Sequence, residues 1–320
     1  MRDKEIKEIF EKGLFEGKIK FDESMSAYTS LKIGGPLEIM VFPEDIVSLK
    51  NCLITAREQE IPLFVLGAGT NLLVRDGGVD GMAVCLKAFK NIRIIVNLKN
   101  LFPNKSSAIE LESYVGLFVE AGVPIGRLIN FTKKNGYSGI EALAGIPGTF
   151  GGAVYMNPGS FGTEIKDVLV SVAVMNIKGE IRILEKEGLK FSYRSSNIPE
   201  DMIILSANII LKKDSPEKVS GLVKEFLEKK RLSHPVGELS AGCIFKNPGG
   251  DSAGRLIEAA GCKGIMAGDA EVSTVHANYF INKGRATCRD FMKLMETVKV
   301  KVKGFSDITL EPEIRIIGRD

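Results

Sequence analysis

Apolar and polar residues follow two different periods in the first 90 residues, which predicts short strands and one amphipathic helix. Residues 43–60 read PEDIVSLKNCLITAREQE, with apolar residues at helical spacing after a proline near the helix start. We expect the apolar positions on one face of this helix to be buried, namely Ile46, Leu49, Leu53 and Ala56. Strands are expected over 61–71, as a buried strand entering a glycine turn, and over 81–87 and 92–98.

Between residues 91 and 212 the period is mostly that of strands. One helix is expected at 124–136, PIGRLINFTKKNG, and Gly136 would end it because glycine readily adopts the left-handed conformation of a helix C-cap. A second glycine turn, at Lys178-Gly179, divides the run 168–186 into two strands. Further strands are expected over 107–115 and 202–214.

Helices dominate the pattern from residue 213 to 305. The first begins with Ser215 as its cap and Pro216 in its first turn, both typical of helix N-termini. The last segment, ITLEPEIRIIG at 308–318, returns to a strand pattern and is a candidate to rejoin an earlier sheet. Because strands and helices come in separate runs, the pattern favours an α+β fold. The three helices are expected over 215–231, 251–261 and 287–302, the last with Phe291, Met295 and Val298 along one side.

Composition excludes several classes of function. The chain has 320 residues, 44% of them hydrophobic, which is enough for real cores. Its net charge of +3 is too small for a dedicated nucleic-acid binder. The N-terminus, MRDKEIKEIF, predicts an amphipathic helix rather than a signal peptide. Without a run of about 18 apolar residues, no transmembrane helix is expected. We therefore expect a protein that binds neither nucleic acid nor membrane.

Cysteine and histidine usage argues against disulfides and metal sites. The five cysteines, at 52, 85, 243, 262 and 288, contain no C-x-x-C pair, and there are only two histidines, His234 and His276. An odd number of cysteines in a long chain makes a disulfide framework unlikely, and together with the expected absence of a signal peptide and of a transmembrane helix it predicts a cytoplasmic protein. Judged by residue type alone, Cys243 would be an ordinary buried thiol.

Two stretches are too rich in glycine to be ordinary turns. They are LGAGTNLLVRDGG at 66–78 and GIEALAGIPGTFGGAVYMNPGS at 139–160. Glycine lets the backbone approach a ligand, and successive N–H groups can cradle a phosphate. Neither a dinucleotide-fold fingerprint nor a P-loop fits, because the third glycine of the former would fall at Leu72 and no Gly-Lys-Ser/Thr is present. Two such loops indicate a pyrophosphate clamp made from two sides, which suits a dinucleotide such as FAD.

Five motifs in a fixed order resemble one family. GAGTNLLV at 67–74 and GIPGTFGGAV at 145–154 are followed by FSYRSS at 191–196, SAGCIFKNP at 240–248 and LEPEIRIIG at 310–318. The set resembles the MurB family, the UDP-N-acetylenolpyruvoylglucosamine reductases of peptidoglycan synthesis. The resemblance extends over about 28–318 and is to the shorter type, without an extra tyrosine-bearing loop.

Three positions depart from the family pattern. Cys243 stands where serine is common, Tyr28 where histidine is frequent, and residues 156–162 read MNPGSFG instead of MNAGAYG.

The resemblance implies a fold, a cofactor and a domain arrangement. It implies an FAD-binding fold of the vanillyl-alcohol-oxidase/PCMH type, built from two subdomains and followed by a C-terminal α+β substrate-binding domain. We expect the first FAD-binding subdomain at 1–90 and 306–320, the second at 91–212 and the substrate domain at 213–305. FAD should be non-covalent, since no histidine lies near residues 60–85 or 140–160. We expect a monomer without an obligate protein partner.

The family reaction reduces an enolpyruvyl ether of a UDP-sugar, with NADPH as the reductant. Hydride from reduced FAD adds to the methylene carbon, and charge builds on the neighbouring carbon and its carboxylate. By resemblance, Arg194 pairs with that carboxylate, Glu313 lies near the enolate and Cys243 donates the proton. An arginine binds a carboxylate with two hydrogen bonds, and a thiol is a stronger acid than an alcohol. Without the motif, Glu311 would be as good a candidate as Glu313.

The resemblance also implies two sets of binding residues. The cofactor-binding residues are Gly67, Ala68, Gly69, Thr70, Asn71, Leu72, Gly145, Ile146, Gly148, Thr149, Gly151, Gly152 and Ala153. The substrate-binding residues are Tyr193, Gly242, Lys246, Asn247 and Arg315.

Two other hypotheses about the function stay open. An FAD-dependent oxidase of hydroxy acids or alcohols has the same fold, although many such oxidases hold FAD covalently. A non-catalytic nucleotide-binding module would show no bleaching of a yellow cofactor by NADPH.

Overall fold

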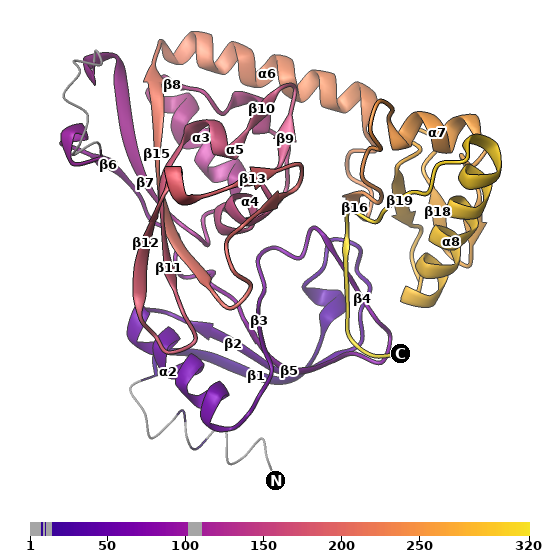
Figure 1. The fold of residues 1–320 in the computed structure, drawn as a ribbon, viewed down its shortest axis with the longest axis horizontal. Coiled ribbons are helices and arrows are strands. Elements are labelled where there is room, and N and C mark those ends of the chain that lie inside the picture. Colours follow the sequence, from indigo (N-terminus) through magenta and orange to yellow (C-terminus); the bar gives the residue numbers. More distant parts are fainter. Residues whose placement is uncertain (1–7, 9, 11–14, 102–110) are drawn as a thin grey trace. The chain divides into compact units, whose positions relative to one another are not determined.

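The computed structural model describes residues 8, 10, 15–101 and 111–320 (Figure 1). The described chain forms two compact units. Unit 1 contains the described residues of 1–19, together with 41–67 and 83–228, and unit 2 contains 20–40, 68–82 and 229–320. The two units do not test the predicted three-part division, which stays a prediction. The helix predicted over 1–10 and the first part of the strand predicted over 107–115 fall largely outside the described residues.

The principal sheet of unit 1 has five strands in a continuous order, with a sixth attached to its central strand. All of its neighbouring strands are antiparallel. The strand β15, predicted at 202–214, is central, and the predicted turn at Lys178-Gly179 joins β11 to β12. The strands, in order, are β12 (Ile181–Glu185), β11 (Leu169–Met175), β15 (Ile203–Lys213), β7 (Tyr114–Glu120) and β6 (Ile92–Ile95), and β8 (Tyr137–Ser138) pairs with β15.

Helices cover one face of this sheet (Figure 1). The predicted helix α3 (Ile125–Asn135) ends at Gly136, which has φ +66° and donates its N–H to Thr132. The strands β13 (Phe191–Ser192) and β14 (Ser195–Ser196) form a hairpin, as do β9 (Gly159–Ser160) and β10 (Thr163–Glu164). The other helices are α2 (Ile46–Glu58), α4 (Phe150–Met156), α5 (Ile165–Val168) and α6 (Pro216–Ser233).

A further sheet has the order β1 (Gly17–Ser24), β2 (Pro36–Pro43), β5 (Val79–Val84), β3 (Leu63–Val65). The strand predicted over 61–71 was expected to be buried, but β3 lies at the edge of this sheet and Val65 is 43% exposed. Short 3-10 helices connect several elements: η1 (Met25–Ala27), η2 (Leu98–Leu101), η3 (Leu111–Ser113), η4 (Glu141–Leu143) and η5 (Lys186–Gly188).

The helix α2 confirms most of its predicted buried face. Leu49, Leu53 and Ala56 are buried, but Ile46 is 37% exposed. Helical side chains point back toward the N-terminus, so the first residue extends past the end of the buried face. Asp45 caps this end by accepting a hydrogen bond from the Ser48 N–H.

Unit 2 contains a sheet that the sequence pattern did not reveal. Its order is β16 (Ser240–Cys243), β19 (Tyr279–Asn282), β18 (Ala270–Val272) and β17 (Met266–Ala267). Strands of two to four residues are too short to show an alternating period. The predicted helices α7 (Ala253–Ala259) and α8 (Cys288–Ser306) pack with this sheet around one apolar cluster, which includes Phe245, Phe280 and Phe291. As expected, the C-terminal strand rejoins an earlier segment: β20 (Arg315–Ile317) runs parallel to β4 (Leu72–Val74).

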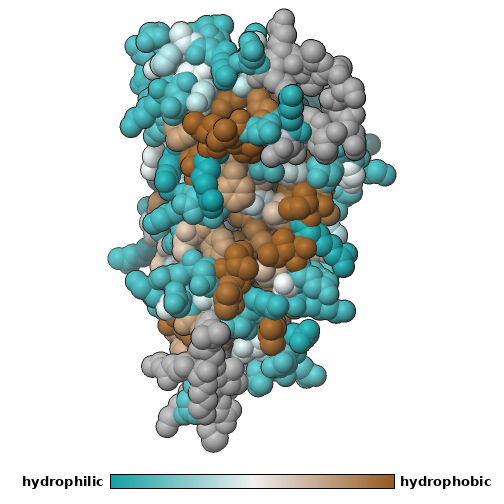
Figure 2. Space-filling view, turned by 90° about the vertical axis from the view of Figure 1, so that its left-hand side faces the viewer, coloured by the Kyte–Doolittle hydropathy of each residue, from teal (hydrophilic) through white to brown (hydrophobic). Residues whose placement is uncertain are grey.

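Apolar side chains also reach the surface. The face on the left in Figure 1 carries them between charged ones (Figure 2). In unit 1, Ile94 of β6 and Ile181 and Ile183 of β12 are 48%, 50% and 57% exposed, on the two edge strands of the principal sheet. Among the described helices, none combines the length and apolar character needed to cross a membrane.

Gly126 in α3 and Gly136 directly after it should respond oppositely to substitution by alanine. At Gly136, φ is +66° and an added Cβ would lie 2.3 Å from the Asp214 carbonyl oxygen, so Gly136→Ala should destabilise the protein by about 1–2 kcal/mol. At Gly126 an added Cβ meets nothing within 4 Å, so Gly126→Ala should stabilise it by about 0.5 kcal/mol. Urea unfolding followed by circular dichroism would measure both, and equal shifts would contradict the expectation.

Candidate active site

A bulge in strand β16 sets the direction of Cys243. Ser240 pairs with Ile281 and Cys243 pairs with Tyr279, so β16 has one residue more than β19 between these pairs. Gly242 has φ +77° there, and a Cβ at this position would meet nothing within 4 Å. A bulge bends its strand and redirects a side chain, which is why bulges are frequent beside active sites. Cys243 is half-buried, whereas the other four cysteines are buried.

The chain after Cys243 pairs with the segment that carries Glu313. The Glu313 N–H donates to the Ile244 carbonyl at 2.7 Å, and the Lys246 N–H donates to the Glu311 carbonyl at 2.8 Å. Between these bonds, Phe245 and Pro312 form an antiparallel bridge. Two of the predicted catalytic residues, Cys243 and Glu313, therefore lie on neighbouring segments of unit 2.

Glu311 and Glu313 occupy different environments. The side chain of Glu311 is 74% exposed, and its Oε2 lies 3.5 Å from Lys246 Nζ. Glu313 is half-buried, and its Oε2 atom is buried from solvent. The two glutamates, separated by one residue on the same extended segment, therefore differ in exposure: the carboxyl group of Glu311 faces solvent, whereas an oxygen of the Glu313 carboxyl is turned away from it.

Two asparagines brace this pair of segments. Asn278 is 1% exposed, donates from Nδ2 to the Phe245 carbonyl at 2.7 Å and accepts the Phe245 N–H at 2.9 Å. Asn71, predicted to bind cofactor, donates from Nδ2 to the Glu313 carbonyl at 3.2 Å, and its carbonyl accepts the Arg315 N–H at 3.0 Å. The sequence interpretation did not identify Asn278, because its partner lies 33 residues away along the chain.

Arg194 lies in unit 1, in the two-residue turn between β13 and β14. Its φ of +57° is left-handed, which costs a non-glycine residue about 1 kcal/mol or more. Its Nη1 donates to the Gly159 carbonyl at 3.2 Å, and its Cζ lies 5.1 Å from the centre of the Tyr193 ring. Strain of this kind persists where the surroundings fix the backbone, so this turn is a candidate functional feature.

The two glycine loops come into contact at one point in unit 1. A Cβ on Gly67 would lie 2.9 Å from Thr149 Oγ1, so a side chain at position 67 would have to displace the Thr149 hydroxyl. Thr149 caps α4 by accepting the Gly152 N–H, and Gly145 and Gly148 have φ of +79° and +141°. Such close backbone approach, with amides at the start of a helix, suits the phosphates of a dinucleotide. The residues present therefore fit the flavin cofactor that the sequence predicts.

Asn247 and Gly69, predicted to bind substrate and cofactor, and Tyr28, which departs from the family pattern, each make contacts within the protein. Asn247 accepts the Ala253 N–H at 2.9 Å at the start of α7. Gly69 packs against the backbone, since an added Cβ would lie 2.0 Å from the Tyr28 carbonyl oxygen. The Tyr28 hydroxyl donates to Glu23 Oε2 at 2.6 Å. Each of these residues therefore contributes to holding the local structure in place.

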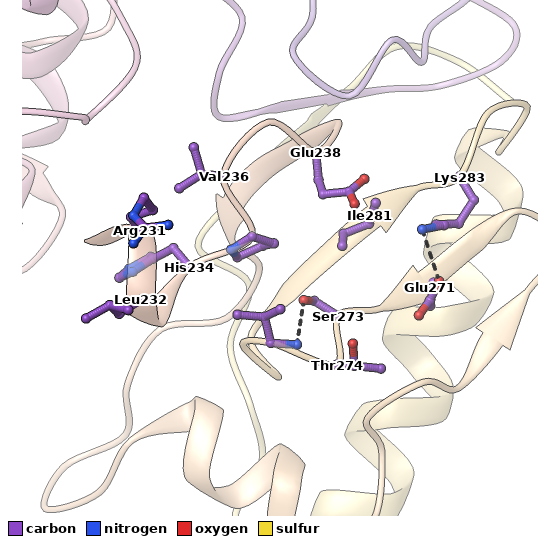
Figure 3. A pocket seen from close by; sticks show the side chains of 12 residues that line it. Arg231, Leu232, His234, Val236, Glu238, Glu271, Ser273, Thr274, Ile281 and Lys283 are labelled. Atoms are coloured by element: carbon purple, nitrogen blue, oxygen red, sulfur yellow. Dashed lines mark hydrogen bonds and ion pairs between the residues drawn. The ribbon is translucent and has the colours of Figure 1, made fainter. Parts of the chain in front are cut away.

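A pocket of about 480 Å³ opens in unit 2 (Figure 3). Ile281, which pairs with Ser240 of β16, lines it, and so does His234. The His234 ring stacks on His276 with centroids 5.3 Å apart, and both rings meet the edge of Tyr279. Burial lowers the pKa of both histidines, and it lowers the pKa of Lys230 to about 8. The other lining residues are Arg231, Leu232, Pro235, Val236, Glu238, Glu271, Ser273, Thr274, Val275 and Lys283.

Comparison with known proteins gives matches along nearly the whole chain. Residues 37–185 match the family model described as "FAD binding domain", and residues 234–317 match "UDP-N-acetylenolpyruvoylglucosamine reductase, C-terminal domain". The predicted α+β FAD-binding fold with a C-terminal α+β domain is thereby confirmed.

Relatives that match along almost their whole length carry the name of the same reductase family. A UDP-N-acetylenolpyruvoylglucosamine reductase of Syntrophus aciditrophicus is 37% identical over 97% of this chain and 95% of its own length. One of Rubrobacter xylanophilus is 38% identical over 93% and 95%. The crystal structure of a reductase with this name from Thermus caldophilus matches with a TM-score of 0.76 and 32% identity, over 95% of this chain and 99% of its own.

The cysteines should differ sharply in reactivity, because only a thiolate attacks an alkylating reagent. Burial raises the pKa of Cys52 to about 12, that of Cys288 to about 11, and those of Cys85 and Cys262 above the ordinary value. We expect iodoacetamide at pH 8 to label the native protein at Cys243 first, as peptide mass spectrometry would show. Cys243→Ser should take up no label on the same timescale, and rapid labelling of the buried thiols would contradict this.

Proposed function

Because this chain belongs to the UDP-N-acetylenolpyruvoylglucosamine reductase family, we propose that it reduces the enolpyruvyl group of UDP-N-acetylglucosamine enolpyruvate. The product is the lactyl ether, UDP-N-acetylmuramate, a precursor of peptidoglycan. Bound FAD, reduced by NADPH, supplies the hydride that adds to the methylene carbon. One observation supports this role most strongly: the Gly242 bulge places a partly accessible Cys243 beside the segment that carries Glu313.

Cys243 is the proton donor in this proposal. Its thiol gives a proton to the enolate carbon after the new C–H bond has formed at the methylene carbon. Its partial accessibility and its attachment to a strand bulge fit a group that must reach substrate. The neighbouring Glu313 stabilises the enolate from its half-buried position, by sharing a proton with the developing negative charge.

Arg194 binds the substrate carboxylate. A guanidinium stays charged at all working pH values and matches a carboxylate in shape, so it stabilises the charge that spreads from the enolate onto that group. The strained turn and the hydrogen bond to Gly159 restrict where the guanidinium can lie. Tyr193, Gly242, Lys246, Asn247 and Arg315 are proposed to contact other parts of the substrate.

The glycine loops hold the cofactor in this proposal. Gly67 and Thr149 supply the close backbone approach. Amides near the start of α4 come from Gly145, Ile146, Gly148, Thr149, Gly151, Gly152 and Ala153. Gly69 and Asn71 also stabilise the fold, since Gly69 packs against Tyr28 and Asn71 donates a hydrogen bond to Glu313.

An anaerobic titration tests the function. NADPH should bleach the yellow flavin, and one equivalent of the enolpyruvyl substrate should restore its colour. Reoxidation by a hydroxy acid's keto product but not by the enolpyruvyl ether would favour an oxidase, and absence of bleaching would favour a binding module.

Acid precipitation should release the colour into the supernatant, since the flavin is held without a covalent bond.

Arg194→Ala and Glu313→Gln should separate the two half-reactions. Both variants should still be bleached by NADPH, but reoxidation by the enolpyruvyl substrate should slow by about 100-fold or more, because each loses a group that stabilises the developing charge. Stopped-flow absorbance of the flavin measures both rates. Glu311→Gln is the matched control, and if it were the slow variant the roles of the two glutamates would be reversed.

Substitutions of Cys243 should distinguish acid chemistry from packing. Cys243→Ala should keep the fold and flavin reduction but lose turnover, while Cys243→Ser should retain much activity through its hydroxyl. An ionised thiol has no proton to give, so parent turnover should fall at alkaline pH as the thiol ionises. Cys243→Ser should lack that alkaline limb in a pH–rate profile. A fully active Cys243→Ala would show that the thiol only fills space.

A further inference from the structure

Three left-handed non-glycine residues lie close together around the Arg194 hairpin. Asn157, Phe161 and Arg194 have φ of +44°, +48° and +57°. Asn157 ends α4, Phe161 lies in the turn between β9 and β10, and Arg194 lies in the turn between β13 and β14. The two hairpins are joined by the Arg194 Nη1 bond to the Gly159 carbonyl. A backbone strained at three points needs fixed surroundings to hold it.

The Asn157 side chain ties these segments together. It has no exposed surface, and its Nδ2 donates to Glu164 Oε2 at 3.0 Å and to the Ser192 carbonyl at 3.3 Å. Its Oδ1 accepts the Lys166 N–H at 3.2 Å. One amide thus joins the end of α4, the start of α5 and the strand that leads into the Arg194 turn. The other strand of that hairpin is held by the Ser196 hydroxyl, which donates to the Tyr155 carbonyl at 2.8 Å.

Glu164 interacts with both residues: it accepts a hydrogen bond from the Asn157 side-chain amide, and it is attracted by the positive charge of Arg194. Lys166, the Asn157 amide and the charge of Arg194 all hold the pKa of Glu164 below its usual range. Glu164 also pairs with Gly159, the residue whose carbonyl receives Arg194 Nη1. Gly159 has no room for a side chain there, since an added Cβ would lie 2.9 Å from Glu164 Cγ.

We propose that Asn157 is a positioning residue for Arg194: its amide fixes the strand before the arginine turn and the carboxylate beside it. Asn157 itself touches neither the reacting atoms nor the guanidinium in this scheme. The inference rests on the proposed function, because it assumes that Arg194 binds the substrate carboxylate. The expected effect is therefore confined to the half-reaction in which that carboxylate is present.

Asn157→Asp tests this with almost no change of shape. The introduced carboxylate cannot donate to Ser192 or Glu164, so the arginine turn should loosen. Flavin reduction by NADPH should stay within about twofold of the parent, while reoxidation by the enolpyruvyl substrate should slow by about tenfold to a hundredfold. Calorimetry should show weaker binding of UDP-N-acetylmuramate by a similar factor, which gives a readout independent of turnover.

The pH dependence of Asn157→Asp separates positioning from general damage. The introduced carboxyl would face Glu164, with Lys166 and Arg194 nearby, and the adjacent negative charge favours its protonated form. A protonated carboxyl has an O–H that can donate again, as the amide does. The activity deficit relative to the parent should shrink as the pH falls and grow as it rises.

The matched control is Asn176→Asp. Asn176 is also buried, donates from Nδ2 to Glu180 Oε2 at 2.8 Å and accepts two backbone N–H groups, but it lies in the turn between β11 and β12. It should lose stability like Asn157→Asp and leave both half-reactions unchanged. If Asn157→Asp does not fold, Asn157→Gly removes the same amide while keeping the left-handed backbone, and it should slow the same half-reaction.

Several results would overturn the inference. These are equal slowing of both half-reactions, unchanged reoxidation, a deficit that does not vary with pH, or failure of both Asn157 variants to fold, which would make Asn157 a purely structural residue. A parent protein that is not reoxidised by the enolpyruvyl substrate would instead overturn the proposed function.

Discussion

The return of the C-terminus to the chain after Cys243 is the interaction on which unit 2 depends. Segment 311–313 pairs with segment 244–246 through two backbone hydrogen bonds, and β20 then runs beside β4. A single extended segment thus contacts the first glycine loop through Asn71 and, through Ile244, the strand that carries the proposed proton donor. Because the bonds are made by the backbone, they set the position of Glu313 whatever side chains surround it.

In both units, a buried asparagine side chain makes hydrogen bonds of the kind that a neighbouring strand would make. Asn278 acts on Phe245, and Asn157 acts on the hairpin of Arg194. A side-chain amide offers both a donor and an acceptor, so it can replace a neighbouring strand where none is present. Both amides hold segments that carry proposed catalytic residues, and each costs stability if one of its bonds is left unmade in the interior.

The sequence revealed the elements whose period extends over many residues. The helices α2, α3 and α8 and the long strands β11 and β15 were all predicted, and the motifs located Cys243, Arg194 and Glu313. The sheet of unit 2 was not predicted, because its strands have two to four residues and their pairing is set by distant partners. Asn157 and Asn278 were not identified for the same reason: nothing local distinguishes a bracing amide from an exposed one. The resemblance chose Glu313 over Glu311, and the structure adds their difference in burial, which alternation alone does not give.

At the Gly242 bulge the backbone conformation restricts position 242 to glycine, whereas the side chain at position 243 can change. Open space surrounds the glycine, so the demand there is conformational: at φ +77° a residue with a Cβ is strained even where nothing touches it. The next position carries no such demand, since its side chain points from a backbone already set. A thiol and a hydroxyl can therefore replace one another at position 243 without any redesign of the strand, so the proposed proton donor can change while the turn that directs it stays the same.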